Sequence, residues 1–99
     1  KMVTVQNEYD SKKGTFYIED NGQRIAEMVY VFSGEGMFII EHTEVDPSQE
    51  GKGLGKLLVK EAVEWAREKD YKILPLCPYA KRVFDKTPEY ADVLFSMKK

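Results

Sequence analysis

Three glycines within five positions, Gly51, Gly53 and Gly55, stand between a strand-like and a helix-like stretch. Glycine allows positive φ angles and lets a ligand approach the backbone closely. The free N–H groups at a helix start, reinforced by the helix dipole, bind anions, and phosphate or pyrophosphate is the natural ligand. Lys52 and Lys56 could add positive charge. Residues 51–56 therefore predict a phosphate-binding loop, with a plain connecting turn as the alternative.

Two common phosphate-binding loops do not fit this segment. A Walker loop requires Gly-Lys-Ser/Thr, but Leu57 follows Lys56, and its first glycine would fall on Glu50. The dinucleotide-binding fingerprint requires a third glycine at the position of Lys56. The loop therefore belongs to neither class.

The single cysteine stands directly before a proline. Pro78 lacks an N–H and suits the first position of a helix, which places Cys77 at the N-cap. A helix N-terminus stabilises a thiolate, so Cys77 is a candidate reactive group. The alternative is a small buried side chain. The neighbouring Tyr79 is a candidate proton donor or a packing residue.

The first half of the chain alternates apolar and polar residues, which is typical of strands. Strands are expected at residues 2–6, 15–19, 24–32 and 37–45, and Asn21-Gly22 predicts a tight hairpin. Residues 24–32 carry apolar side chains on both faces, so we expect this strand to be covered on both sides.

The second half changes to helical periodicity. A helix is expected at residues 53–69, a strand at 71–76 and a short helix at 78–86. The fourth strand, the long helix and the fifth strand form a βαβ unit with a right-handed crossover. Residues 1–99 therefore predict a single α+β domain with a mixed, mostly antiparallel sheet.

Composition excludes several classes of protein. The 99 residues carry a net charge of −2, which argues against a nucleic-acid binder. No apolar run approaches the ~18 residues of a membrane span, and the first ten residues do not resemble a signal peptide. One cysteine excludes an internal disulfide and a multi-cysteine zinc site. We expect a cytoplasmic protein with no metal and no membrane or nucleic-acid partner.

The glycine loop lies within a longer pattern. Val45-Asp46-Pro47, then Glu50-Gly51-Lys52-Gly53-Leu54-Gly55 and Leu57-Leu58, closely resembles motif A of the GNAT acyltransferase superfamily. The resemblance implies a minimal GNAT-like fold, acetyl-CoA as acetyl donor and an unidentified primary amine as acceptor. It implies contacts from the ends of the fourth strand and the loop to CoA, at Thr43, Val45, Gly51, Lys52, Gly53, Leu54, Gly55 and Lys56.

Other short segments narrow the resemblance. His42-Thr43 and Cys77-Pro78-Tyr79 are similar to segments of very small GNAT-like proteins that have a cysteine after strand five. In the family, strands four and five splay apart, and Pro75 suits such a gap or an edge strand.

The sequence departs from the family pattern at several positions. Glu50 stands where the family has Gln or Arg, and we expect it to point away from the loop. Phe84 replaces a tyrosine that commonly protonates the departing CoA thiolate. The usual two helices between strands one and two, and two final strands, have no counterpart here, and they help to form the acceptor site.

Acetyl transfer to an amine needs a base, because a free lysine amine has a pKa of ~10.4. His42 is the only histidine, and a free imidazole, with a pKa of ~6.5, suits this task. A buried structural histidine is the alternative. Glu41 or Glu44 is a second candidate base; alternation places Glu44 on the same face as His42.

Cys77 has two candidate roles in this chemistry. It could be acetylated transiently, or it could donate the proton that the missing tyrosine supplies. The resulting interpretation is an acetyl-CoA-dependent N-acetyltransferase. The alternative is a non-catalytic module that binds or senses acetyl-CoA. The acceptor and the oligomeric state stay open.

Overall fold

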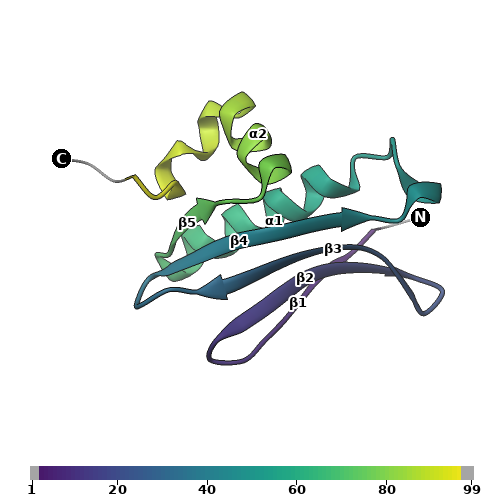
Figure 1. The fold of residues 1–99 in the computed structure, drawn as a ribbon, viewed down its shortest axis with the longest axis horizontal. Coiled ribbons are helices and arrows are strands. Elements are labelled where there is room, and N and C mark those ends of the chain that lie inside the picture. The colour runs from purple at the N-terminus through teal and green to yellow at the C-terminus, as the bar shows by residue number, and fades with distance from the viewer. Residues whose placement is uncertain (1–2, 97–99) are drawn as a thin grey trace.

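The computed structural model describes residues 3–96 and contains one five-stranded sheet in the order β1-β2-β3-β4-β5 (Figure 1). The strands are β1 (Val5–Tyr9), β2 (Lys13–Asp20), β3 (Gln23–Phe32), β4 (Met37–Val45) and β5 (Lys72–Pro75). Strands β1 to β4 pair antiparallel with one another in chain order, and β5 pairs parallel with β4. The predicted mixed, mostly antiparallel sheet is confirmed.

Two α-helices and two 3-10 helices complete the fold. They are η1 (Pro47–Gln49), α1 (Leu54–Lys69), α2 (Pro78–Lys86) and η2 (Pro88–Val93). The predicted bounds of α2 are confirmed, and Cys77 is its N-cap. Pro78 explains this start, since proline lacks the N–H that a helix leaves unpaired there. No helix within residues 3–96 is long and apolar enough to cross a membrane.

Turn residues set the register of the hairpins. Asn21 and Gly22 have φ angles of 53° and 77°, as the predicted hairpin between β2 and β3 requires. The prediction of a first strand at residues 2–6 is wrong, because β1 runs from Val5 to Tyr9. The Asp10 carboxylate accepts hydrogen bonds from the backbone N–H groups of Lys12 and Lys13, which turns the chain directly after Tyr9. Met2 lies outside the described residues.

The helices cover one face of the sheet. On β3 the side chains of Ala26, Met28 and Tyr30 are buried, whereas the alternate residues Val29 and Val31 are only half-buried. The prediction that this strand is covered on both sides is therefore wrong. Side chains on the neighbouring strands half-bury Val29 and Val31, so this second apolar row needs no further layer over it.

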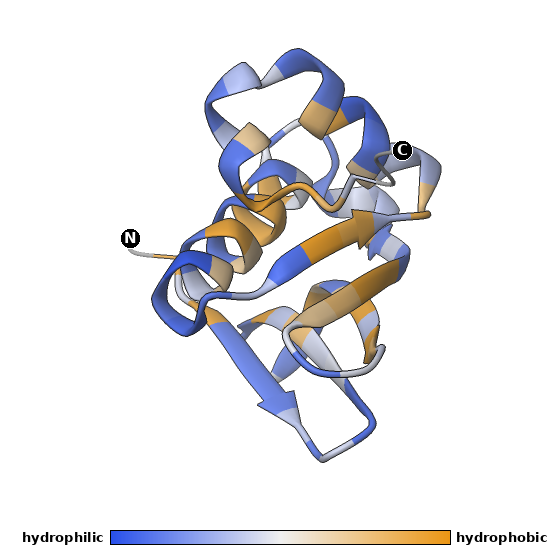
Figure 2. Cartoon of the chain, turned by 90° about the vertical axis from the view of Figure 1, so that its left-hand side faces the viewer, coloured by the Kyte–Doolittle hydropathy of each residue, from blue (hydrophilic) through white to orange (hydrophobic). Residues whose placement is uncertain are grey.

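One core joins the sheet and the helices. Leu58, Ala62 and Ala66 of α1 are fully buried, and Ala80 and Phe84 attach α2 to the same cluster. Hydrophobic stretches lie where the helix layer faces the strands, and the turns at the top of the view are mostly hydrophilic (Figure 2). The core therefore packs α1 and α2 against the sheet.

Candidate functional site

Strands β4 and β5 separate midway along β4. Their pairing ends at Ile40 and Pro75, and the Ile40 carbonyl accepts hydrogen bonds from the N–H groups of Leu76 (3.0 Å) and Cys77 (3.1 Å). β4 continues to Val45, so its edge beyond Ile40 has no partner strand within the described residues. The gap predicted at Pro75 is present, and β5 is also the edge strand of the sheet.

A β-bulge in β4 lies at the same level. Val29 is paired with His42 and Tyr30 with Ile40, so Glu41 is an extra residue on β4. Bulges commonly redirect side chains next to functional sites. Beyond the bulge, Thr43 is paired with the buried Met28 and His42 with the half-buried Val29, so Thr43 lies on the helix-covered face and His42 on the opposite face.

The glycine loop forms a cavity with the end of β4. This cavity has a volume of about 320 Å³. Its lining brings together seven of the predicted site residues: Thr43, Val45, Gly51, Gly53, Leu54, Gly55 and Tyr79. Gly51 and Gly53 have φ angles of 87° and 77°, which only glycine adopts without strain. Glu50 is exposed but also lines the cavity, so the prediction that it points away from the loop is not confirmed.

The start of α1 is not capped by any side chain. Its N-cap is Gly53, in the left-handed conformation, with no side-chain hydrogen bond to the first turn. The first N–H groups of a helix have no partner within the helix itself. The first turn of α1 can therefore donate to an anion in the glycine-loop cavity.

Lys52 and Lys56, which were predicted as ligand-binding residues, do not line the glycine-loop cavity. The Lys52 ammonium donates a hydrogen bond to the Gln49 side chain (2.7 Å) and does not line the cavity. Lys56 lines a neighbouring cavity together with Arg82 and Tyr79. A ligand in the glycine-loop cavity would thus be held chiefly by backbone groups.

Tyr79 packs directly over the first turn of α1. A Cβ atom at Gly55 would lie 2.6 Å from the Tyr79 hydroxyl, so any other residue at this position would have to displace the Tyr79 ring. Burial raises the pKa of the Tyr79 phenol, although the nearby Arg82 charge opposes the rise. Tyr79 therefore remains a neutral hydrogen-bond donor at physiological pH.

Cys77 is buried beside Thr43, which lines the glycine-loop cavity, but Cys77 itself is not part of the lining. Its side chain is in a residue only 5% exposed, and its Sγ donates a hydrogen bond to Thr43 Oγ1 at 3.3 Å. No side-chain hydrogen bond ties the thiol to the backbone of α2. The thiol thus lies at the start of α2, across the gap from the unpaired edge of β4.

His42 lies on the opposite face from Cys77. Its side chain is 61% exposed, and Nε2 is 3.6 Å from Glu44 Oε1. The alternative of a buried structural histidine is therefore wrong. Glu41 is also exposed. The four predicted catalytic residues do not form one cluster: Cys77 and Tyr79 flank the helix side of the gap, and His42 and Glu41 lie at the strand end.

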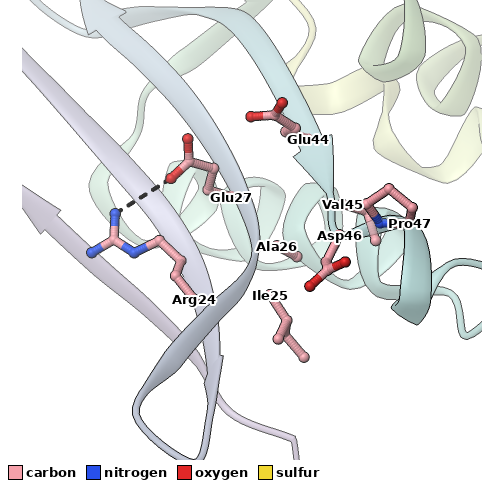
Figure 3. Close-up of a pocket in the computed structure, with 8 residues that line it drawn as sticks. All are labelled: Arg24, Ile25, Ala26, Glu27, Glu44, Val45, Asp46 and Pro47. Carbon is pink, nitrogen blue, oxygen red and sulfur yellow. Dashed lines mark hydrogen bonds and ion pairs between the residues drawn. The ribbon is translucent and has the colours of Figure 1, made fainter.

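A second cavity, of about 390 Å³, lies beside the end of β4 (Figure 3). Glu27, Glu44 and Asp46 contribute carboxylates to its lining, and Arg24 lies 3.5 Å from Glu27. Glu27 was not predicted as a site residue, because it lies mid-strand. The register that pairs Glu27 with Glu44 is the signal that could have identified it. This cavity can accept a cationic group.

The chain matches known proteins over most of its length. A family model described as GCN5-related N-acetyl-transferase matches residues 15–93. Protein NATD1 of Gallus gallus is 31% identical over 85 residues, which cover 85% of this chain and 77% of NATD1.

Solved structures share the fold. A GCN5-like protein of Staphylococcus aureus is 33% identical, with a TM-score of 0.74 over 96% of this chain and 90% of that chain. A GNAT family acetyltransferase of Elizabethkingia anophelis, with acetyl-CoA bound, has a TM-score of 0.62 at 14% identity, covering 74% of this chain and 63% of that chain. The chain belongs to the GCN5-related N-acetyltransferase family.

Proposed function

We propose that this protein transfers an acetyl group from acetyl-CoA to a primary amine at the gap between β4 and β5. The observation that carries the proposal is the cavity that the glycine loop, at an uncapped helix start, forms with the unpaired edge of β4. Thr43 lines this cavity, and its hydroxyl accepts a hydrogen bond from the buried Cys77 thiol.

The residues of the cavity fit acetyl-CoA. The N–H groups of residues 51–56 are suited to the pyrophosphate, since glycines and a helix N-terminus present donors to phosphate oxygens. The edge of β4 at Thr43 and Val45 is suited to the amide groups of the pantetheine arm, because a strand edge without a partner offers backbone donors and acceptors. The acetyl-CoA bound to the Elizabethkingia fold neighbour supports this assignment.

The amine acceptor approaches from the open face of the sheet. His42 and Glu44 lie there, and the carboxylate-lined cavity of Glu27 and Glu44 attracts a cationic amine. His42, or alternatively Glu41, takes a proton from the ammonium form of the acceptor. The neutral nitrogen then attacks the acetyl carbonyl carbon, the carbon–sulfur bond breaks, and the CoA sulfur receives a proton.

Cys77 has two roles open to it in this reaction. As a proton donor, its thiol gives a proton to the departing CoA sulfur, in place of the absent tyrosine. As a nucleophile, its sulfur takes the acetyl group and CoA leaves as the thiol, after which the amine attacks the new thioester. The buried position beside Thr43 supports either role, because both need a thiol shielded from water at the gap.

A panel of primary amines tests the proposal. CoA release is measured with acetyl-CoA and each amine, for the wild-type protein and for Cys77→Ala. The expected result is release above the buffer rate for at least one amine, with a reduced rate in the variant. Tight acetyl-CoA binding without release for any amine contradicts the transferase and supports the binding module.

A further inference from the structure

A cationic cavity lies next to the glycine loop, between the first turn of α1 and the outer face of α2. It has a volume of about 360 Å³, within the range of about 300–1,000 Å³ typical of small-ligand sites. Its lining includes three cations and two aromatic rings: Lys56, Tyr79, Arg82, Lys86 and Tyr90. No carboxylate side chain is part of the described lining.

These three cations are not used in ion pairs. Nearby lysines on the same helices are paired along the surface, Lys60 with Glu64 (3.6 Å) and Lys81 with Asp85 (3.2 Å). Within residues 3–96, Lys56, Arg82 and Lys86 have no such partner. These exposed cations therefore give this cavity a local positive charge in a chain of net charge −2, and they are free to bind an anionic ligand.

The spacing of residues along α2 places the α2 residues that line the cationic cavity on one side of the helix. Tyr79, Arg82, Val83 and Lys86 recur at spacings of three and four, so they share one helical face. The buried Phe84 contacts the ring of Tyr90 edge-on at 5.8 Å, which fixes that ring at the rim. The cavity therefore offers an apolar, aromatic floor ringed by positive charge.

The cationic cavity is adjacent to the proposed CoA site. Tyr79 lines both cavities, and Lys56 follows Gly55, which lines the glycine-loop cavity. A ligand whose pyrophosphate lies at the glycine loop would extend its next groups, a phosphorylated ribose and a base, over Tyr79. Phosphate suits Arg and Lys, and a base suits an aromatic ring.

We propose that Lys56, Arg82 and Lys86 bind the 3′-phosphate of CoA, so that this protein selects CoA thioesters over their dephospho forms. The inference rests on the proposed function and adds to it the group by which the acetyl donor is recognised.

Binding of CoA and of 3′-dephospho-CoA tests the inference. The wild-type protein should bind CoA about tenfold more tightly, the effect of one charge-assisted contact. The preference should fall as salt rises, because exposed cations are screened. The double variant Arg82→Gln/Lys86→Gln should bind both ligands alike. Lys81→Gln, on the same helix but paired with Asp85, should keep the preference.

The outcomes separate this inference from the proposed function. Equal affinity of the wild-type protein for the two ligands overturns the inference and leaves the CoA site in place. A preference that persists in the double variant also overturns it. Failure of both ligands to bind overturns the proposed function itself. Thermal unfolding of each variant confirms that its fold is intact.

Discussion

The Cys77 thiol donates a hydrogen bond to the Thr43 hydroxyl across the gap between α2 and β4, with Sγ and Oγ1 3.3 Å apart. The two residues are 34 positions apart in the chain. Their contact joins the N-cap of α2 to the strand end just beyond the β-bulge. It holds the thiol beside Thr43, which lines the glycine-loop cavity.

Replacing Cys77 by alanine should lower the turnover number at least tenfold, because a positioned proton donor or nucleophile contributes about 10²–10⁴-fold. Thr43→Val, which keeps the shape but removes the acceptor of the thiol hydrogen bond, should have a smaller effect in the same direction. Both rates are measured as CoA release with the best amine of the panel.

Intact-mass analysis after incubation with acetyl-CoA distinguishes the roles of Cys77. An acetyl adduct that is absent in Cys77→Ala identifies the nucleophile. Turnover loss without an adduct identifies the proton donor. Wild-type turnover in Cys77→Ala removes the thiol from the chemistry.

Gly55→Ala should destabilise the fold, although alanine normally stabilises a helix over glycine by about 0.5–1 kcal/mol. The new Cβ would lie 2.6 Å from the Tyr79 hydroxyl, and such overpacking costs about 1–3 kcal/mol. Urea unfolding measures the change. In a Tyr79→Ala background the same substitution should lose its penalty. An equal penalty in both backgrounds contradicts the direct packing of Tyr79 on Gly55.

His42→Gln should lower kcat/KM by about 10²-fold, the lower range for a general base. The same kcat/KM measurement on Glu41→Gln tests the second candidate base. If Glu41→Gln lowers kcat/KM and His42→Gln does not, the base is Glu41. Wild-type kcat/KM in both variants leaves neither residue as the base.

Stability should fall at alkaline pH through Tyr30. Burial raises the pKa of its phenol well above the usual value, and the phenol donates a 2.6 Å hydrogen bond to Asn7. The folded chain therefore keeps a proton that the unfolded chain loses near pH ~10. The contribution of Tyr30 to the free energy of unfolding is therefore complete below about pH 10. Above that pH it declines by up to about 1.4 kcal/mol per pH unit.

The Tyr30→Phe variant isolates this effect. Because the variant cannot form the hydrogen bond to Asn7, its free energy of unfolding at neutral pH should be about 1 kcal/mol lower than that of the wild type. Between pH 9 and about 11, its stability should depend less on pH than that of the wild type. Urea midpoints across this range supply the comparison. Parallel pH dependence in the two proteins rules out a role for Tyr30.

Local chemistry made most of the fold predictable from sequence. Asn21-Gly22 determined a hairpin, and Pro78 determined the start of α2, because each restricts the backbone at its own position. The first strand was misplaced because Asp10 turns the chain through side-chain hydrogen bonds that alternation does not report.

The site was predictable only where its residues are adjacent in sequence. The glycine loop is one continuous segment, so its conformation followed from its composition. The bulge at Glu41 and the contact of Thr43 with Cys77 depend on pairing between distant strands and helices. The separation of Lys52 from Lys56 depends on the packing of α2 against α1, which no local pattern encodes.

Titration of the protein with acetyl-CoA, followed by backbone amide chemical shifts, tests the central claim most directly. The largest changes should fall on residues 51–56 and on Thr43, Val45 and Cys77, which border the glycine-loop cavity and the gap. Amides of β1 and of the distant turn at Gly34 should not move. The absence of any response from the glycine loop and the end of β4 at millimolar acetyl-CoA contradicts the account.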